Sequence, residues 1–569
     1  MEEKKLTGYP SIDKPWLKYY PVGAESVPVP EKTAFELVFD RQRNNPNPAL
    51  IYLGQKISFK KLYSKIADCA KAFQAAGVKS NDIVTIALPL IPETVYIFYA
   101  LNRIGAISNF IDPRLKPNEY VHSMVETDSR LLVATDLFQD TVIRVKKDLD
   151  NLQIVFVSPL ESASPLLKVL SPKNKSMLDV GASWAEFIRQ GRSVSSLADE
   201  KFIKNKAATI VHTGGTTGFP KGVMLTNENF NAMALTQEIS DFGFQSGESI
   251  LTFLPPFIAY CLVNAIHDPL YLGWKNTLVP KFEYTDFPSL VMKHKPNHVL
   301  GGPILWDNFI KSPLTQKADL SFLKSPISGG DSMNTELERQ INDFLLSHHC
   351  THKIMQGYGM TEVSAAACFS SDNSYCEGSV GIPYVKNVIS IFDTETNDEL
   401  SYGNEGEVCI QSPTMMSGYF RNPDATSEII KTHSDGSVWL HTGDCGVMNE
   451  HGNLFIKGRM KRMIVRSGNK IFPTSIEAVI LRNKNVSNCA VVQMAHECER
   501  HVPVAFLVLK NPEAFDETVH ELNQLIGSVL PEFNIPYKYF IKDELPLTGI
   551  NKIDFRALEK EAEKGQVRL

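Results

Sequence analysis

Residues 212–223, HTGGTTGFPKGV, carry the signal that decides how this chain is interpreted. Four glycines, three threonines and one lysine lie together in this stretch. Glycine lets backbone amides approach phosphate oxygens, and short hydroxyls with one mobile cation complete such a site. A Walker loop is excluded, because Lys221 follows Pro220 and precedes Gly222. We therefore expect a loop that holds a triphosphate loosely through hydroxyl groups, with a glycine-rich surface turn as the alternative.

The composition is that of an ordinary globular protein. The 569 residues predict roughly four domains or subdomains. Hydrophobic residues make up 43% and charged residues 21% of the chain. The net charge of -6 gives no reason to expect a nucleic-acid partner, and the basic run at 457–466 is interpreted as a solvated face or a hinge.

Three features bear on the compartment. Nine cysteines without a C-x-x-C pair indicate reduced thiols in a cytoplasm. The first 16 residues lack the apolar core of a signal peptide. Residues 249–267 carry no formal charge but contain Pro255 and Pro256, so we expect a buried strand, a turn and a helix start there. A soluble cytoplasmic protein without a membrane span is predicted.

Helices and strands alternate through the first part of the chain. Helical periodicity extends over residues 59–76 and 92–103. Strand-like runs occupy residues 83–88, 106–111, 250–255 and 276–280. This alternation predicts an α/β fold whose mainly parallel sheets are covered by helices on both faces.

The pattern changes near residue 458. A strand-rich stretch precedes this point, at residues 405–413 and 453–458. Behind it we expect a helix at 475–482, strands at 488–494 and 502–509, and a helix at 517–530. The fold class is therefore α/β, with a large N-terminal domain of several subdomains over residues 1–458, one of them β-rich, and a small α+β domain over residues 459–569.

Three further motifs carry chemistry suited to a nucleotide. In QGYGMTE, residues 356–362, Tyr358 offers a ring to a purine and Glu362 offers a hard oxygen ligand to magnesium, although a turn before a helix is the alternative. In TGD, residues 442–444, Asp444 can accept hydrogen bonds from two ribose hydroxyls, or simply belong to a β-turn. In SPISGGDSM, residues 325–333, Asp331 either accepts from an adenine amino group or caps a helix that begins at Met333.

These motifs, in this order over residues 210–552, resemble those of the adenylate-forming superfamily, which includes acyl-CoA synthetases, peptide-synthetase adenylation domains and luciferase. The resemblance implies ATP and Mg²⁺ as cofactors. It places Tyr358 at adenine, Thr361 at phosphate, Glu362 at magnesium, and Asp444 with Arg459 at ribose. The phosphate loop it implies consists of Thr213, Gly214, Gly215, Thr216, Thr217, Gly218 and Lys221, with Thr217, Lys221 and Glu362 acting in catalysis. The remaining nucleotide-binding residues are Gly329, Gly330, Asp331, Gln356, Gly357 and Gly359.

The C-terminal stretch 546–558, PLTGINKIDFRAL, resembles the late signature of the superfamily, with Asn551 in place of a glycine. The resemblance makes Lys552 the catalytic lysine, which reaches the acid and the α-phosphate by closure of a mobile C-terminal domain. It places the hinge at Lys461 and brings the loop around Gly468 to the site for the second step. A lone surface lysine is the alternative for Lys552.

The segment LPPFIAYCL, residues 254–262, aligns with the substrate pocket of the superfamily. Ile258 stands where peptide synthetases carry an aspartate for an α-ammonium group and where many acyl-CoA synthetases carry histidine. An unpaired buried ammonium is too costly, so an α-amino acid is disfavoured. An apolar lining for an aliphatic tail is expected from Phe257, Ile258, Tyr260, Gly301 and Gly302.

The predicted reaction has two steps. A carboxylate attacks Mg-ATP to give an acyl-adenylate and pyrophosphate, and the thiol of coenzyme A then displaces AMP to give a thioester. Two alternatives stay open. The first is a stand-alone ligase that loads the phosphopantetheine arm of an acyl or peptidyl carrier protein. The second is a nucleotide-binding pseudoenzyme, suggested by Asn551, Ile258 and Asp331.

Overall fold

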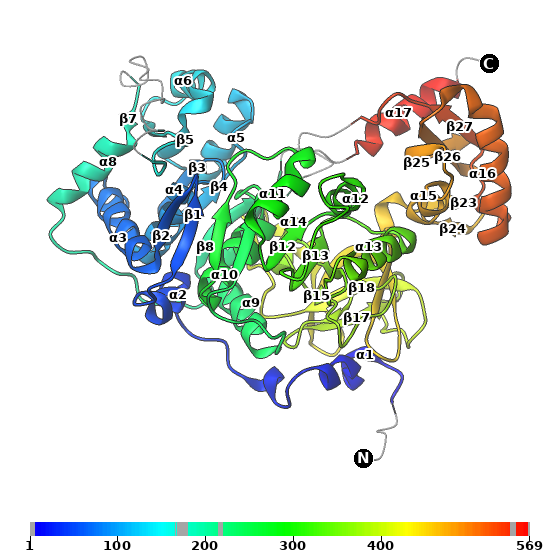
Figure 1. The fold of residues 1–569 in the computed structure, drawn as a ribbon, viewed down its shortest axis with the longest axis horizontal. Helices are drawn as coiled ribbons and strands as arrows, with labels where there is room; N and C mark the ends of the chain where they lie inside the picture. The colour runs from blue at the N-terminus through cyan, green and yellow to red at the C-terminus, as the bar shows by residue number, and fades with distance from the viewer. Residues whose placement is uncertain (1–5, 165–166, 168–179, 214–219, 547–552, 567–569) are drawn as a thin grey trace.

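The computed structural model describes residues 6–164, 167, 180–213, 220–546 and 553–566. The strands of these residues form four sheets. Three sheets belong to the large N-terminal part, and the fourth lies in a smaller lobe that carries the C-terminal helices (Figure 1). The predicted fold class is confirmed.

The largest sheet has nine strands in the order β16-β15-β14-β13-β12-β10-β11-β1-β2. Its six central strands are parallel, and the strands at its two edges pair antiparallel. The strands are β1 (Pro48–Tyr52), β2 (Gln55–Ser58), β10 (Ser249–Thr252), β11 (Lys275–Leu278), β12 (His298–Gly301), β13 (Ser325–Gly329), β14 (Met355–Tyr358), β15 (Cys368–Phe369) and β16 (Ile382–Pro383).

The second sheet has eight strands in the order β19-β9-β8-β4-β3-β5-β6-β7. It is parallel from β8 to β7, and β9 and β19 extend it antiparallel. The strands are β3 (Ile83–Ala87), β4 (Ile107–Phe110), β5 (Leu131–Thr135), β6 (Gln153–Val157), β7 (Ala182–Ser183), β8 (Ala207–His212), β9 (Gly222–Thr226) and β19 (Gly418–Tyr419).

Helices cover both faces of these sheets, as alternating segments predict. One continuous core joins the two sheets through α2 (Ala34–Gln42), α3 (Phe59–Ala75), α4 (Pro92–Arg103), α9 (Asn227–Ile239) and α10 (Asp268–Leu272). All twelve residues of α4 are buried, because this helix is enclosed on every side. The first sheet is covered on its other face by α11 (Phe287–His294), α12 (Pro303–Lys311) and α13 (Thr335–Ser347), and the second by α5 (Pro117–Thr127) and α6 (Gln139–Asp148).

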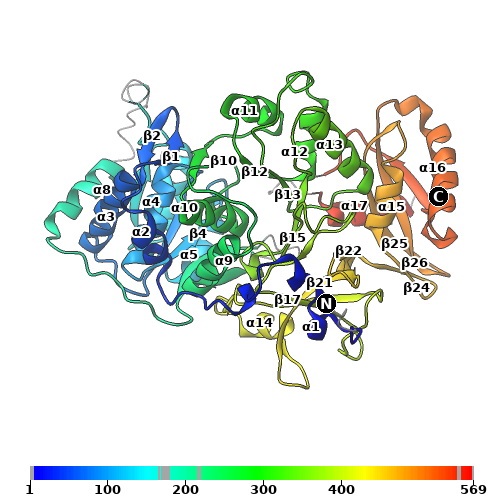
Figure 2. The same cartoon turned by 60° about the horizontal axis from the view of Figure 1, so that its bottom comes forward.

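The third sheet is antiparallel and contains β17 (Val388–Phe392), β18 (Gly406–Gln411), β20 (Ile430–Thr432), β21 (Val438–Met448) and β22 (Leu454–Arg459). The short helix α1 (Pro10–Asp13) lies beside this sheet, and α14 (Pro423–Ile429) leads into β20 (Figure 2). This sheet is the β-rich part that the sequence predicts.

The fourth sheet forms the smaller lobe. It contains β23 (Ile464–Arg466), β24 (Asn469–Ile471), β25 (Val486–His496), β26 (Arg500–Leu509) and β27 (Lys538–Ile541). Helices α15 (Pro473–Ile480) and α16 (Phe515–Val529) pack on one face, and α17 (Phe555–Gln566) packs on the other. Alternation along β25 explains this arrangement, because Cys489 and Val491 face α15 and α16 while Ala490 and Val492 face α17.

The uncharged stretch 249–267 contains β10 and the π-helix η6 (Tyr260–His267), which continues into α10. Within the described ranges we found no helix with both the length and the apolar character needed to cross a bilayer.

Candidate active site

The ends of the glycine-rich loop lie side by side at the top of a β-hairpin. Strands β8 and β9 pair antiparallel, with His212 opposite Gly222. The backbone amide of Thr213 donates to the carbonyl of Lys221 over 3.0 Å, which closes the hairpin. Gly214, Gly215, Thr216, Thr217 and Gly218 lie outside the described residues.

Three residues from two motifs meet at one point. The Tyr358 hydroxyl, at the end of β14, donates to Asp444 Oδ2 over 2.7 Å. Asp444 Oδ1 accepts from Arg459 Nε at 2.8 Å, across the pair that β21 and β22 form. The Asp444 side chain is 5% exposed and that of Arg459 is 56% exposed. The cluster therefore combines a fixed buried carboxylate with a cation that solvent or a ligand can reach.

The electrostatics of this cluster keep Tyr358 protonated. Burial raises the pKa of Asp444, although the charge of Arg459 and the hydroxyl of Tyr358 oppose this shift. Burial and the neighbouring Asp444 carboxylate raise the pKa of Tyr358 well above its usual value. Tyr358 is thus a hydrogen-bond donor, and its ring is held in place by Asp444.

A second carboxylate holds the TGD turn, and sequence reasoning missed it. Glu407 on β18 accepts from the Gly443 amide over 2.9 Å through Oε1 and contacts His441 Nδ1 at 2.8 Å through Oε2. Cys409 joins this group, whose ligand atoms all lie within 4.8 Å of one another. Because β18 and β21 are neighbours only in the folded sheet, no local pattern identifies Glu407 as the support of Asp444.

Lys221 and Glu362 approach the same tyrosine. The Tyr419 hydroxyl donates to Glu362 Oε1 over 2.6 Å, and Lys221 Nζ lies 4.8 Å from the centre of the Tyr419 ring. Burial, and then the Glu362 carboxylate, raise the pKa of Tyr419, so its hydroxyl stays protonated. Sequence reasoning missed Tyr419, because a tyrosine in a short strand is indistinguishable from a core residue. It links two predicted catalytic residues.

The backbone around Glu362 is tightly folded. A Cβ atom on Gly359 would lie 2.0 Å from the carbonyl oxygen of Ala365, so only glycine fits there. Ser364 and Ala365 adopt φ values of 57° and 88°, in the left-handed region that alanine rarely occupies. Such strained backbone clusters at ligand sites. Thr361 and Glu362 are therefore presented by a rigid turn.

Glycines lie at or one residue before the carboxyl ends of three neighbouring parallel strands. Gly301 ends β12, Gly329 ends β13, and Gly357 in β14 pairs with Gly329. The carboxyl ends of parallel strands are where α/β sheets bind ligands. A Cβ atom on Gly329 would lie 3.2 Å from Tyr260 Oη, and one on Gly302 would lie 3.7 Å from the Gly329 carbonyl. The predicted acid pocket and adenine turn are thus in contact.

The structure corrects one alternative for Asp331. Helix α13 begins at Thr335 rather than at Met333, and its N-cap is Asn334, whose side chain accepts from the Leu337 amide over 2.8 Å. Asp331 instead accepts from the Ser332 amide over 2.8 Å and is exposed. Asn334 is the N-cap because it lies three residues before the Leu337 amide, which needs an acceptor. Gly330 has a φ of 85°, which suits the turn that presents Asp331.

The segment predicted to line the acid pocket is only partly apolar. Phe257 and Ile258 are half-buried and pack against the main core. The buried hydroxyl of Tyr260 has no hydrogen-bond partner among the described residues. Beyond Tyr260 the same helix carries Asn264 and Asp268 inward, which sequence reasoning did not single out.

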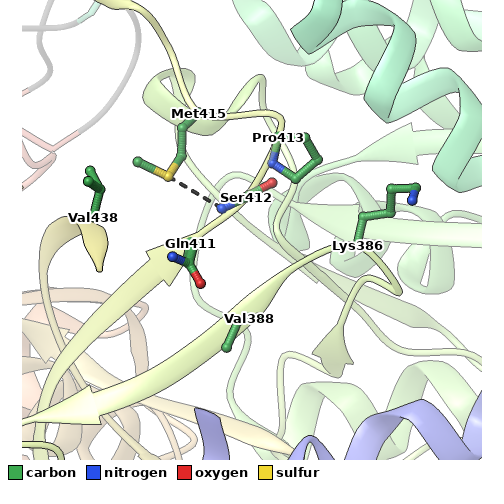
Figure 3. A pocket seen from close by; sticks show the side chains of 7 residues that line it. All are labelled: Lys386, Val388, Gln411, Ser412, Pro413, Met415 and Val438. Carbon is green, nitrogen blue, oxygen red and sulfur yellow. Dashed lines mark hydrogen bonds between the residues drawn. The ribbon is translucent and has the colours of Figure 1, made fainter. Parts of the chain in front are cut away.

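The remaining predicted positions lie toward the small lobe. Gln356 is buried in β14, Lys461 is exposed in the 3-10 turn η9 (Met460–Arg462), and Gly468 is exposed in the turn between β23 and β24. Lys552 lies outside the described residues. A separate shallow pocket on the third sheet, which no motif predicted, involves none of the predicted site residues (Figure 3). It is lined by Lys386, Val388, Gln411, Ser412, Pro413, Met415 and Val438.

Comparison with known families identifies the class of this chain. A family model described as AMP-binding enzyme matches residues 39–420, and one described as AMP-binding enzyme C-terminal domain matches residues 475–552. The chain belongs to the AMP-binding enzyme family, and the predicted membership of the adenylate-forming superfamily is confirmed.

Relatives with different acids resemble this chain to a similar degree. A long-chain-fatty-acid–CoA ligase of Bacillus subtilis (strain 168) is 27% identical over 572 residues, covering 98% of this chain and 99% of the relative. A 4-coumarate–CoA ligase 1 of Arabidopsis thaliana is 29% identical over 500 residues, covering 86% of this chain and 85% of the relative. The predicted enzyme class, an acid–thiol ligase, is that of these relatives.

Solved structures confirm the fold. ATP-bound MatB from Rhodopseudomonas palustris superposes with a TM-score of 0.80 at 21% identity, covering 93% of this chain and 98% of that one. The anthranilate CoA ligase AuaEII, in complex with anthranoyl-AMP, gives a TM-score of 0.81 at 20% identity, covering 96% and 99%.

Proposed function

We propose that this enzyme activates a carboxylic acid with ATP and transfers the acyl group to the thiol of coenzyme A. The carboxylate attacks the α-phosphate, pyrophosphate leaves, and the thiol then displaces AMP from the acyl carbon. Membership of the AMP-binding family supports this proposal. The observation that carries it is the cluster of Tyr358, Asp444 and Arg459, which offers a ring, a buried acceptor and an accessible cation at one point.

In this proposal the nucleotide lies across the carboxyl ends of β12, β13 and β14. Adenine rests on the Tyr358 ring beside Gly329 and Gly330, and the ribose hydroxyls donate to Asp444 while Arg459 donates to them. The phosphates lie at the loop that Thr213 and Lys221 close. Asp331, freed from any capping role, is placed to accept from the adenine amino group.

Magnesium fits the donor set near this loop. Glu362 supplies a hard carboxylate oxygen, and Tyr419 holds Oε1 so that Oε2 stays available. When bound, the ion screens the charge of the phosphates. The chain itself contributes the cation of Lys221 and the fixed direction of the Glu362 carboxylate.

The small lobe, residues 459–569, supplies the mobile part. We propose that it turns about Lys461, bringing Lys552 to the acid and α-phosphate for the first step and the Gly468 turn for the second. The exposed position of Lys461 in η9, two residues after the end of β22 at Arg459, supports a hinge there. In the present arrangement Thr474 donates to the Lys457 carbonyl over 2.5 Å.

The acid is proposed to be aliphatic over the part that lies against Phe257 and Ile258. Ile258 provides no charge for an α-ammonium group, so α-amino acids are excluded by desolvation cost. Coenzyme A is the proposed acceptor because the named relatives are CoA ligases.

Acid-dependent pyrophosphate exchange tests this proposal. The purified protein is incubated with Mg-ATP, labelled pyrophosphate and a panel of carboxylic acids, and coenzyme A or a phosphopantetheinylated carrier protein is then added. We expect exchange with at least one acid and a CoA thioester afterwards. Exchange followed only by carrier loading would assign the acceptor to a carrier protein, and no exchange with any acid would contradict the proposal.

A further inference from the structure

A row of polar side chains leads from the acid pocket into the core. Tyr260, Asn264 and Asp268 follow one another at intervals of four residues along η6 and into α10. Side chains at this spacing share one face of a helix. At the α-helical rise per residue the row would span about 12 Å. Its outer end is Tyr260, whose hydroxyl borders Gly329. Eight residues of π-helix are rare, and such segments are frequent at functional sites.

The inner end of the row is enclosed by other polar groups. Asn264 Nδ2 donates to Asp268 Oδ2 over 2.8 Å. Gln237 on α9 donates to the Tyr384 hydroxyl over 3.2 Å. A hydrogen-bonding contact from Gln237 also lowers the pKa of Asp268, and the charge of Asp268 raises the pKa of Tyr384. Asp268 is only 3% exposed. The row therefore ends in a cluster of polar side chains within an otherwise apolar core, and this cluster is called the chamber below.

Three atoms of this row lack a partner. Tyr260 Oη, Asn264 Oδ1 and Asp268 Oδ1 are buried without a hydrogen bond among the residues that the structure describes. An unsatisfied buried polar atom costs about 1–3 kcal/mol, so native proteins keep few of them. Two of the three atoms can only accept while Asp268 is ionised. A group that donates hydrogen bonds would therefore satisfy these acceptors once Asp268 is ionised.

Within the described part of the chain, Asp268 also lacks a cationic partner that would stabilise its ionised form. The ion pairs of the described residues include no partner for it. Burial raises the pKa of Asp268 to about 8, although Asn264 and Gln237 lower it in part. Its neighbour His267 supplies no cation, because burial lowers the pKa of that ring to about 3 and its Nδ1 contacts the Tyr99 hydroxyl. A ligand that donates to Asp268 would stabilise its carboxylate form.

We propose that the acid carries a hydrogen-bond donor, a hydroxyl or an ammonium group, at the end away from its reacting carboxylate, and that Asp268 and Asn264 bind this group. The inference rests on the proposed function, since it assigns the substrate of the same site. The apolar contacts of Phe257 and Ile258 then accept the methylene spacer, and the chamber selects the far end. Asp268 is a specificity-determining residue and takes no part in the chemical steps.

The test compares matched acids. Straight-chain acids of graded length are assayed by pyrophosphate exchange beside the same acids with a terminal hydroxyl, ammonium or second carboxylate. For the length that reaches the chamber, we expect kcat/KM to favour a donor-bearing acid over the plain acid by about tenfold or more. The dicarboxylic acid should be worse than the plain acid, because its second carboxylate would be buried beside Asp268 without a cationic partner.

Variants assign this preference to the chamber. Asp268→Leu should remove or reverse it, and Asp268→Asn should retain preference for the hydroxyl while losing preference for the ammonium. The matched control is His267→Gln, which alters an equally buried neighbour that contacts Tyr99 and Phe230 instead. A ratio of kcat/KM values for two acids does not depend on how much of a variant is folded.

The outcomes separate the two proposals. If the wild-type enzyme uses plain acids as well as donor-bearing acids at every length, ordered water fills the chamber and this inference is wrong, while the proposed function stands. If no acid supports exchange, the proposed function fails and the inference fails with it. If the preference exists but survives Asp268→Leu, another part of the pocket binds the far end of the acid, and the assignment to Asp268 is wrong.

Discussion

The nucleotide side and the acid side of this site differ in how completely their buried carboxylates are hydrogen-bonded. Around Asp444 each carboxylate oxygen already has a partner, from Tyr358 or Arg459, and Glu407 fixes the turn behind it. Around Asp268 one oxygen is bound to Asn264 and the other is left without a partner in the described chain. Both carboxylates are buried within the same enzyme.

This difference separates a preformed site from one that a ligand completes. A satisfied network holds its geometry before the nucleotide arrives. An unsatisfied one gains most from a ligand that supplies the missing donors, which makes it discriminating. The relatives named above act on different acids, so the acid side is where a ligand-completed site would set specificity.

The largest effect should come from Lys552, which we propose to contact both the acid and the α-phosphate. Lys552→Ala should slow adenylation by about a thousandfold, because charge building between the acid and the α-phosphate loses its cation. Conversion of a supplied acyl-adenylate to thioester should stay near the native rate. Single-turnover assays of each half-reaction measure this, with the exposed Lys560→Ala of α17 as control. Equal loss in both half-reactions would contradict a role confined to the first step.

A substitution on the nucleotide side should reduce activity less than Lys552→Ala. Asp444→Asn keeps the shape but removes the charge that Arg459 pairs with and weakens acceptance from ribose. We expect kcat/KM for ATP to fall by about a hundredfold, with KM for the acid nearly unchanged. Steady-state exchange at varied ATP and acid checks this. The exposed Glu450→Ala, in the turn after β21, serves as control, and a rise confined to KM for the acid would argue against the ribose assignment.

The two kinds of buried carboxylate should differ in their effect on stability with pH. Glu248 has three partners, His298, Lys324 and the Gln245 amide, which outweigh its burial and lower its pKa to about 2. A depressed pKa contributes stability that is present above about 4.5 and is lost as the pH falls toward 2. The raised pKa of Asp268 gives the opposite sign, with stability lost as the pH rises from about 4 to about 8.

Two substitutions isolate these effects. Asp268→Asn should stabilise the ligand-free enzyme at pH 8 by about 2 kcal/mol and have little effect at pH 4. Glu248→Gln should destabilise it at pH 7 by about 2 kcal/mol, with a smaller effect near pH 3. Urea unfolding of each variant across pH measures both. A stability change of Asp268→Asn that is the same at every pH would show that its carboxyl does not titrate in this range.

The smallest effect should come from the tyrosine that joins Lys221 to Glu362. Tyr419→Phe removes the hydroxyl that orients Glu362 and keeps the ring beneath Lys221. We expect the Mg²⁺ concentration for half-maximal exchange to rise about fivefold, the value of one hydrogen bond of about 1 kcal/mol. Tyr402→Phe is the matched control, since it removes a 3.2 Å tyrosine–carboxylate bond to Asp13. An unchanged Mg²⁺ requirement would contradict the proposal that Glu362 binds the metal.

Local motifs made the residues of the nucleotide side predictable. The residues that hold them in place were not predictable, because they come from strands far apart in the sequence. Tyr358, Asp444 and Arg459 stand in short signatures whose residue types already suit a ribose and a purine. Tyr419 and Glu407 act through contacts between β19 and β9 and between β18 and β21, which no local pattern reveals. Sequence therefore identified the groups that would touch the nucleotide and missed those that hold them.

The elements of the fold were predictable where periodicity was long. The helices over 59–76 and 92–103 appear as α3 and α4 nearly to the residue, because their apolar stripes are strong. The predicted start of α13 at Met333 was wrong, because several nearby residues can cap a helix. Only the turn geometry selects Asn334 as the N-cap. The acid pocket was interpreted as apolar because Asn264 and Asp268 lie in a run that otherwise resembles core.

Binding of hydrolysis-resistant acyl-adenylate analogues measures the nucleotide side and the acid side of the site together. Two acyl-sulfamoyl adenosines that differ only in a terminal ammonium or methyl group on the acyl chain are titrated calorimetrically against the enzyme, beside AMP. We expect both to bind more tightly than AMP, and the ammonium-bearing analogue to bind about tenfold more tightly than the methyl one. Binding of neither analogue beyond the affinity for AMP would contradict an adenylating enzyme whose acid pocket is completed by its substrate.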